Sequence, residues 1–210
     1  GELKRRKFKI TFITRNIKGH LSRIIGEEGY ENIILQAASK SFKKKNTDAP
    51  HAHWMTVIWE EDAADTIKAL GNESCDWLIV DHYSIDYRWH RKLRPKVKNI
   101  MVIDDLADRR LDCDLLLDQN FYIEPLSRYK KFISDKCVAL LGPQHMLLRE
   151  EFLNPSPKKT NLENKTLNIL VFMGGVDLTN ETAKVLRALD LIKSYKFHAN
   201  VIIGGSNPFY

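Results

Sequence analysis

The sequence has few cysteines and no long apolar run, and both absences narrow the class of protein. Its three cysteines, Cys75, Cys113 and Cys137, are odd in number and widely spaced. They form no Cys-x-x-Cys pair, so we expect reduced, mostly buried thiols and neither a secreted disulfide framework nor a zinc site. Apolar runs such as 77–80 and 115–117 are far too short to span a bilayer. We therefore expect no membrane insertion.

The first residues show no cationic segment followed by an apolar stretch and a small-residue cleavage site. Together with the reduced cysteines, this predicts a cytoplasmic protein. The net charge of +6 raises the question of nucleic-acid binding. Positive residues cluster at 4–7 and 43–45. Neither cluster contains interleaved aromatic residues or a recognisable nucleic-acid-binding motif. We interpret both as solvated surface and expect no nucleic-acid partner, whereas a mildly basic surface suits a phosphate-bearing small substrate.

The order of apolar patterns predicts an α/β fold with parallel sheets. Apolar runs without strict polar alternation, typical of strands buried on both faces, alternate with helical patterns. Strands are expected at 8–13, 32–35, 77–80, 100–103, 115–117, 138–141, 167–172 and 199–203. Helices are expected at 21–28, 60–70, 85–93, 146–153 and 179–193, and a surface loop at 37–52.

A change of composition predicts two domains. Pro155 and Pro157, followed by two lysines, are typical of a linker. We predict an N-terminal domain over 1–153, a linker over 154–166 and the start of a second domain over 167–210. Two strands and one helix cannot bury a core of their own, so we expect the second domain to be incomplete.

Polar residues follow three of the predicted strands of the first domain. In open parallel sheets, ligands bind beyond the carboxyl ends of the strands. An Asp after a strand can equally cap the next helix, and Asp104 or Asp105 can simply pair with Arg109. Three polar groups along one predicted edge nevertheless favour a polar crevice. The groups are Asp81-His82-Tyr83, then Asp104-Asp105 with Asp108, Arg109 and Arg110, and then Asp118-Gln119-Asn120.

Two glycine turns follow the strands of the second domain. Glycines between a strand and a helix let backbone amides approach a phosphate, and the amino end of a helix favours an anion. Neither turn has the full G-x-G-x-x-G or P-loop pattern, and Asp177 or Thr179 can equally be an ordinary helix cap. The turns contain Gly174, Gly175 and Asp177, and Gly204, Gly205 and Ser206.

Histidines offer one candidate general base. His20 lies in a predicted loop, where a lone histidine is also typical of the surface. His51, His53 and His145 have no spacing that suggests metal binding, and we expect no metal.

Seven segments, in the same order, resemble the UDP-2,4-diacetamido-2,4,6-trideoxy-β-L-altropyranose hydrolases of pseudaminic acid biosynthesis. Related spore-coat polysaccharide biosynthesis proteins are similar. The resemblance covers nearly the whole chain. The segments are 76–83 (DWLIVDHY), 102–109 (VIDDLADR), 113–120 (CDLLLDQN), 141–144 (LGPQ), 148–152 (LREEF), 174–180 (GGVDLTN) and 204–208 (GGSNP).

The resemblance implies a glycosyltransferase-B-like architecture, with two Rossmann-like domains and the substrate between them. It also implies attack of water at the anomeric carbon of a UDP-sugar, releasing UDP, without metal or cofactor, by a monomer. The implied catalytic residues are Tyr83, His82 and Asp81. The implied sugar-binding residues are Asp104, Asp105, Arg109 and Asn120, and the implied nucleotide-binding residues are Gly174, Gly175, Asp177, Gly204, Gly205 and Ser206.

The sequence departs from the family at its amino end. Family members begin with a strand, a Gly-x-Gly-His-x-x-Arg loop that supplies the general base, and a long helix. Too few residues separate Arg23 from Gly29 for that helix, and Glu2 to Arg6 resembles its tail. We therefore expect the base histidine to be absent, with His20 as a weaker candidate, and the chain to be shorter than the family at both ends. An inactive fragment, a nucleotide-sugar-binding partner protein and a glycosyltransferase on the same scaffold stay open.

Overall fold

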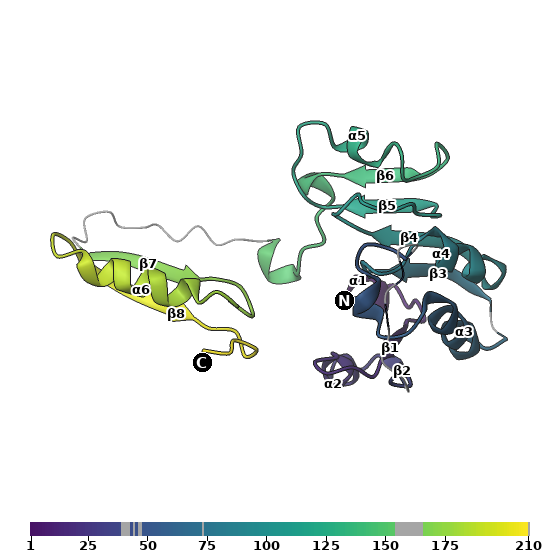
Figure 1. The fold of residues 1–210 in the computed structure, drawn as a ribbon, viewed down its shortest axis with the longest axis horizontal. Helices are drawn as coiled ribbons and strands as arrows, with labels where there is room; N and C mark the ends of the chain where they lie inside the picture. Colours follow the sequence, from purple (N-terminus) through teal and green to yellow (C-terminus); the bar gives the residue numbers. More distant parts are fainter. Residues whose placement is uncertain (39–42, 44, 46–47, 73, 154–165, 210) are drawn as a thin grey trace. The chain divides into compact units, whose positions relative to one another are not determined.

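The computed structural model describes residues 1–38, 43, 45, 48–72, 74–153 and 166–209. The chain divides into two compact units, residues 1–149 and 150–210 (Figure 1). The predicted linker lies outside the described residues, except for Thr166, which is the first residue of a strand.

The first unit is built on a four-stranded parallel sheet. Its strands are β3 (Cys75–Val80), β4 (Val97–Ile103), β5 (Leu115–Asp118) and β6 (Val138–Leu141), in the order β3-β4-β5-β6. All neighbouring pairs are parallel. The predicted α/β class with parallel sheets is confirmed, and the carboxyl ends of all four strands lie at one edge.

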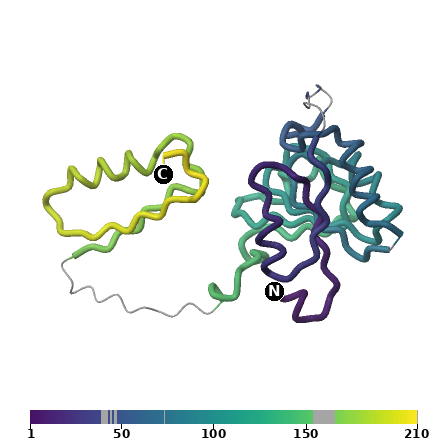
Figure 2. Tube along the Cα trace, turned by 90° about the horizontal axis from the view of Figure 1, so that it is seen from below, coloured from purple at the N-terminus to yellow at the C-terminus, as the bar shows by residue number. Residues whose placement is uncertain are grey.

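A second parallel sheet consists of β1 (Thr11–Arg15) and β2 (Glu31–Leu35). It is drawn below β3 in Figure 1 and in front of the larger sheet in Figure 2. The helix α2 (Ser22–Glu27) connects its strands. Within the described residues, β1 and β3 form no hydrogen-bonded ladder. Arg15 at the end of β1 instead binds Asp62 at 2.8 Å, which ties this sheet to the rest of the unit.

Helices α3 (Trp59–Leu70) and α4 (Tyr87–Leu93) cover one face of the four-stranded sheet. Apolar side chains from both helices and the strands form the core there, and Ala63, Leu93 and Ile100 are fully buried. α3 ends at Gly71, whose φ of +64° lies in a region that glycine adopts without steric cost. α4 begins at Asp86, whose carboxylate accepts the Arg88 amide at 2.9 Å.

The opposite face of the same sheet is only partly buried in the described residues, although Leu117 on it is 1% exposed. Trp77, Ile79 and Val138 expose 47%, 49% and 57% of their surface. Their cross-strand neighbours on that face include Asn99 and Met101, which are half-buried. The expected burial of both faces is therefore complete on the helix-covered face and partial on the other.

The remaining elements of the described residues are short. The predicted helix over 146–153 is wrong, because these residues contain only a 3-10 turn at Glu150–Phe152. The Leu147 amide donates to Gln119 Oε1 at 2.6 Å, and the apolar side chains of Leu147 and Leu153 are exposed. A helix here would have no packed apolar face to stabilise it. The other short elements are α1 (Glu2–Arg5), η1 (Ala52–Met55), η2 (Arg94–Lys96), α5 (Pro125–Tyr129) and η3 (Pro143–His145).

The second unit contains β7 (Thr166–Phe172), α6 (Glu181–Leu191) and β8 (Lys196–Ile202), with the two strands parallel. Among its described residues, Val171 is the one buried apolar side chain. Leu170 on β7 and Leu191 on α6 are 67% and 79% exposed. Across both units, no described helix is long and apolar enough to cross a membrane.

Candidate functional site

The polar residues predicted beyond the four-stranded sheet lie at its carboxyl edge. Asp81 to Tyr83 follow β3, and Asp104 with Asp105 follows β4. Asp118 is the last residue of β5, and Asn120 follows it. The parallel register brings these turns to neighbouring positions.

One carboxylate joins side chains from three of these turns. The Tyr83 hydroxyl donates to Asp105 Oδ1 at 2.7 Å, and Asn120 Nδ2 donates to Asp105 Oδ2 at 3.1 Å. Tyr83 and Asp105 are half-buried and Asn120 is exposed. We call Tyr83, Asp105 and Asn120 the outer trio. Three residues predicted to act on a sugar therefore form one hydrogen-bonded, solvent-accessible group.

The electrostatics shift the pKa values of Tyr83, Asp81 and His82 towards their uncharged forms. The Asp105 carboxylate raises the pKa of Tyr83 to about 12, because a phenolate beside a carboxylate is disfavoured. Burial raises the pKa of Asp81, and nearby Asp105 adds to this while His82 opposes it. Burial also lowers the pKa of His82, whose Nδ1 accepts the Ser84 amide at 3.1 Å. At neutral pH, Tyr83 is thus a hydrogen-bond donor and His82 an uncharged imidazole.

A second acidic group lies beneath the trio. Asp104 and Asp118 are each 2% exposed. Asp104 Oδ1 accepts from Arg109 Nη1 at 2.7 Å, and Asp118 Oδ2 accepts from Arg128 Nη1 at 2.8 Å. The Tyr129 hydroxyl donates to Asp118 Oδ2 at 2.9 Å and lies 2.8 Å from the Asp104 carbonyl oxygen. We call these five residues the inner network.

Arg109 holds two turns together. Its Nε donates to the Ile85 carbonyl at 2.7 Å and its Nη2 to the His82 carbonyl at 3.3 Å, and the residue is 5% exposed. The sequence left open whether Asp104 binds a ligand or pairs with Arg109, and in the structure it pairs with Arg109. In these positions Asp104 and Arg109 support the turns that present Tyr83 and Asp105.

The sequence interpretation missed an aromatic rim beside Tyr83. The rings of His51 and Trp54 lie 6.2 Å and 5.7 Å from the Tyr83 ring, and 5.1 Å from each other. His51 Nε2 lies 3.3 Å from Asp108 Oδ2. An imidazole oriented by a carboxylate is the arrangement that a general base uses. The available signal was His51-Ala52-His53-Trp54, which has three ring side chains in four residues where the expected surface loop ends.

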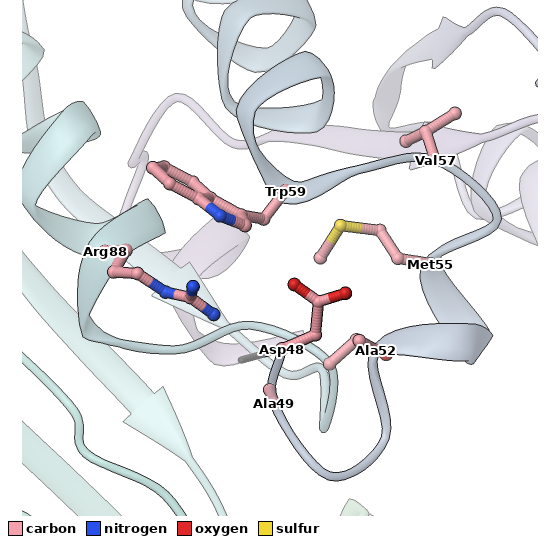
Figure 3. Close-up of a pocket in the computed structure, with 8 residues that line it drawn as sticks. Asp48, Ala49, Ala52, Met55, Val57, Trp59 and Arg88 are labelled. Carbon is pink, nitrogen blue, oxygen red and sulfur yellow. The ribbon is translucent and has the colours of Figure 1, made fainter. Parts of the chain in front are cut away.

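A small hollow lies next to this rim (Figure 3). Its volume is about 10 Å³, which is room for one water at most. Arg88 stacks on Trp59 there, with 5.3 Å between the guanidinium carbon and the ring centroid. The hollow is too small to be a substrate site. It is lined by Asp48, Ala49, Ala52, Met55, Val57, Trp59, Ser84 and Arg88.

His20 occupies an exposed turn before α2. Its Nδ1 lies 2.8 Å from the Ser22 hydroxyl and accepts the Ser22 amide at 3.3 Å. These contacts stay within its own turn, as is typical of a surface histidine.

In the second unit the structure brings the two glycine turns together. Gly174 has a φ of +82°, and Gly204 packs on the backbone of Gly175. A Cβ atom at Gly204 would lie 2.0 Å from the Gly175 carbonyl oxygen, so only glycine fits. Gly205 and Ser206 are exposed. Both turns follow the carboxyl ends of the parallel strands β7 and β8.

The amino end of α6 is already capped. Asp177 accepts the amides of Glu181 at 2.8 Å and Thr182 at 3.0 Å. Asn180 accepts the Ala183 amide at 3.2 Å. Hydrogen bonds from Thr182 lower the pKa of Asp177. For Asp177 the capping alternative is therefore observed, and an anionic ligand would have to bind the glycine turns rather than these amides.

No family model matches the chain. It is similar to the uncharacterized protein MJ1062 of Methanocaldococcus jannaschii, with 29% identity over 151 residues. The aligned part is 70% of this chain and 31% of that protein, so the chain spans about a third of the length of this relative. The resemblance to the UDP-sugar hydrolases stays a prediction. Among the described residues, no group of three or more His, Cys, Asp or Glu side chains is placed to hold a metal ion.

Proposed function

We propose that this chain is part of a nucleotide-sugar hydrolase with a glycosyltransferase-B-like architecture. Its substrate is a UDP-linked 2,4-diacetamido-2,4,6-trideoxy sugar, and its product serves pseudaminic acid or surface-glycan synthesis. The outer trio is the observation that supports this proposal. Sugars are bound by side chains that donate and accept hydrogen bonds at a partly open edge, and Tyr83, Asp105 and Asn120 offer both.

In the proposed reaction, the oxygen of a water forms a bond to the anomeric carbon. The bond between that carbon and the diphosphate oxygen breaks, and UDP leaves with the electron pair. The attacking water loses a proton to a base. His51 suits this role because its imidazole lies beside Tyr83 and its Nε2 faces Asp108 at 3.3 Å. His51 would then replace the loop histidine of the family.

The uridine diphosphate is proposed to bind the glycine turns of the second unit. Gly174, Gly175, Gly204 and Gly205 present backbone without side chains, which lets a diphosphate approach closely. Because Gly204 has no Cβ, its backbone packs directly on that of Gly175 and the two turns lie in contact.

The test incubates the natural full-length protein with the UDP-sugar and measures the release of UDP by chromatography. His51→Gln is expected to lower turnover about a hundredfold, the usual scale for a lost general base. His53→Gln is the matched control, because His53 lies on the same turn but is exposed, and it is expected to leave turnover within about twofold.

Three outcomes would contradict the proposal. Binding of the UDP-sugar without release of UDP would indicate a binding protein. Release that requires an added acceptor would indicate a glycosyltransferase. Equal turnover of the two histidine variants would remove His51 from the mechanism.

A further inference from the structure

Two cysteines lie together at the amino edge of the four-stranded sheet, away from the outer trio. Cys113 Sγ and Cys137 Sγ are 3.6 Å apart, and neither is in a disulfide. Cys113 precedes β5 and Cys137 precedes β6, whose first residues Leu115 and Val138 are direct neighbours.

We propose that Cys113 and Cys137 are a reversible dithiol–disulfide couple. The register of Leu115 with Val138 offsets the two cysteines by one residue. A strand spacing of about 4.8 Å and a rise of about 3.3 Å then give a Cα separation of about 6 Å, which is within the range that disulfides require. The sulfurs must approach from 3.6 Å to about 2.0 Å, a change that side-chain rotation can supply. Formation of the bond therefore requires no rearrangement of the sheet.

The two thiols are suited to different steps. Cys137 is half-buried, whereas Cys113 is 6% exposed. The hydrogen bond from the Cys113 thiol lowers the pKa of Cys137, because it stabilises the Cys137 thiolate. Cys137 is therefore the attacking thiolate and Cys113 the resolving thiol.

A cavity of about 350 Å³ is lined by Cys113 and by Lys136, the residue before Cys137, and brings a small oxidant next to the pair. Its walls are rich in cations. Asp112 pairs with Arg91 and Arg94, and Asp114 also pairs with Arg94. Within the described part of the chain, the other cations of the wall have no carboxylate partner, and the cavity therefore favours an anionic oxidant. These are Arg110, Lys131 and Lys136.

The oxidant that suits the positive charge of this wall is a small anionic disulfide, such as glutathione disulfide. The Cys137 thiolate attacks one of its sulfurs, forming a mixed disulfide and releasing one thiolate. Cys113 then loses its proton and attacks the Cys137 sulfur, releasing the second thiolate. The balance is one protein dithiol and one small disulfide converted to one protein disulfide and two small thiols. Excess reduced glutathione reverses it.

Oxidation closes a covalent ring over residues 113–137, which include Asp118 and Arg128 of the inner network. A ring of this size restricts the unfolded chain and is expected to raise the thermal midpoint by roughly 5–10 °C. The stabilised segment is the connection from β5 to β6.

The test equilibrates the chain with excess glutathione disulfide, then counts free thiols in denaturant and maps the cross-linked peptides. We expect the three thiols of the sequence to fall to one, with Cys113 joined to Cys137. The Cys75→Ser control should form the same bond, and Cys113→Ser should stop at a glutathione adduct on Cys137. Cystamine, a cationic disulfide, should react about tenfold more slowly at low salt.

Three thiols that persist, or a cross-link that includes Cys75, would overturn the couple. If Cys113→Ser fails to fold, the peptide map of the unsubstituted chain still shows whether Cys113 and Cys137 are joined. Equal rates with cystamine and glutathione disulfide would overturn the role of the basic cavity.

Discussion

The outer trio and the inner network occupy the same edge of one sheet and use similar residues, yet their surroundings are opposite. Asp105 of the trio is half-buried and bound by two uncharged donors, Tyr83 and Asn120. Asp104 of the network is 2% exposed and paired with Arg109. A buried carboxylate needs a charged partner, whereas a half-exposed one keeps lone pairs for a ligand. The difference supports a stabilising role for the inner network and is consistent with the binding role that we propose for the outer trio.

Breaking the inner network should give the largest effect. Arg109→Leu leaves the Asp104 carboxylate buried without its cation, and we expect the free energy of unfolding to fall by about 3–5 kcal/mol. Urea denaturation measures this loss. The matched control is Arg110→Leu, at an exposed neighbour, which should change stability by under about 1 kcal/mol. Similar losses for the two variants would contradict the assignment of stability to the inner network.

Acid should lower the stability of the fold through His90, a buried group without an oppositely charged hydrogen-bond partner in the described residues. His90 is fully buried, its Nε2 has no hydrogen-bond partner among the described residues, and burial lowers its pKa to about 4. The unfolded chain, with a pKa near 6.5, binds the proton more readily, so stability is complete above pH 6.5 and is lost as the pH falls towards 4. We expect a loss of roughly 3 kcal/mol over that window.

Urea denaturation at several pH values measures the loss due to His90. His90→Gln, which does not titrate, should flatten the dependence between pH 6.5 and 5. An unchanged slope in this variant would assign the acid sensitivity to other groups, such as His82, whose pKa is also lowered by burial.

Substitution in the outer trio should separate function from stability. Tyr83→Phe removes the donor to Asp105, and we expect turnover of the UDP-sugar to fall about ten- to a hundredfold. The free energy of unfolding should fall by under about 1 kcal/mol, because the phenol is partly exposed and Asp105 keeps Asn120. Steady-state kinetics and urea denaturation on the same preparations measure both. Equal losses, expressed as free energies, would make Tyr83 structural.

The smallest effect is expected at His20. His20→Ala removes contacts confined to Ser22, so turnover should stay within about twofold. A loss of a hundredfold or more would make His20 the general base in place of His51.

Much of the fold could be predicted from periodicity and composition. The apolar runs at 115–117 and 138–141 correspond to β5 and β6, and Gly71 marks the end of α3. The short α5 was missed, because its five residues are too few to give a periodic pattern. The predicted helix over 146–153 failed, because helical spacing of apolar residues does not show whether a surface is present for them to pack on.

The candidate site could be predicted only to the level of its turns. The sequence placed Asp104 and Asp105 at the edge of the sheet, but which of them points inward depends on the twist and packing of the turn. His51 lies far from Tyr83 along the chain, so its proximity to Tyr83 is a tertiary contact that local patterns do not contain. The capping of α6 by Asp177 was one of two alternatives that the sequence left open.

The most direct test compares the neighbouring variants Asp105→Ala and Asp104→Ala by calorimetric titration with the UDP-sugar and by urea denaturation. Asp105→Ala should stay within about 1 kcal/mol of the parent in stability and bind at least about tenfold more weakly. Asp104→Ala should lose several times more stability, roughly 3–5 kcal/mol. Unchanged binding by a folded Asp105→Ala variant, or equal destabilisation by the two substitutions, would contradict the division of this edge into a binding trio and a supporting network.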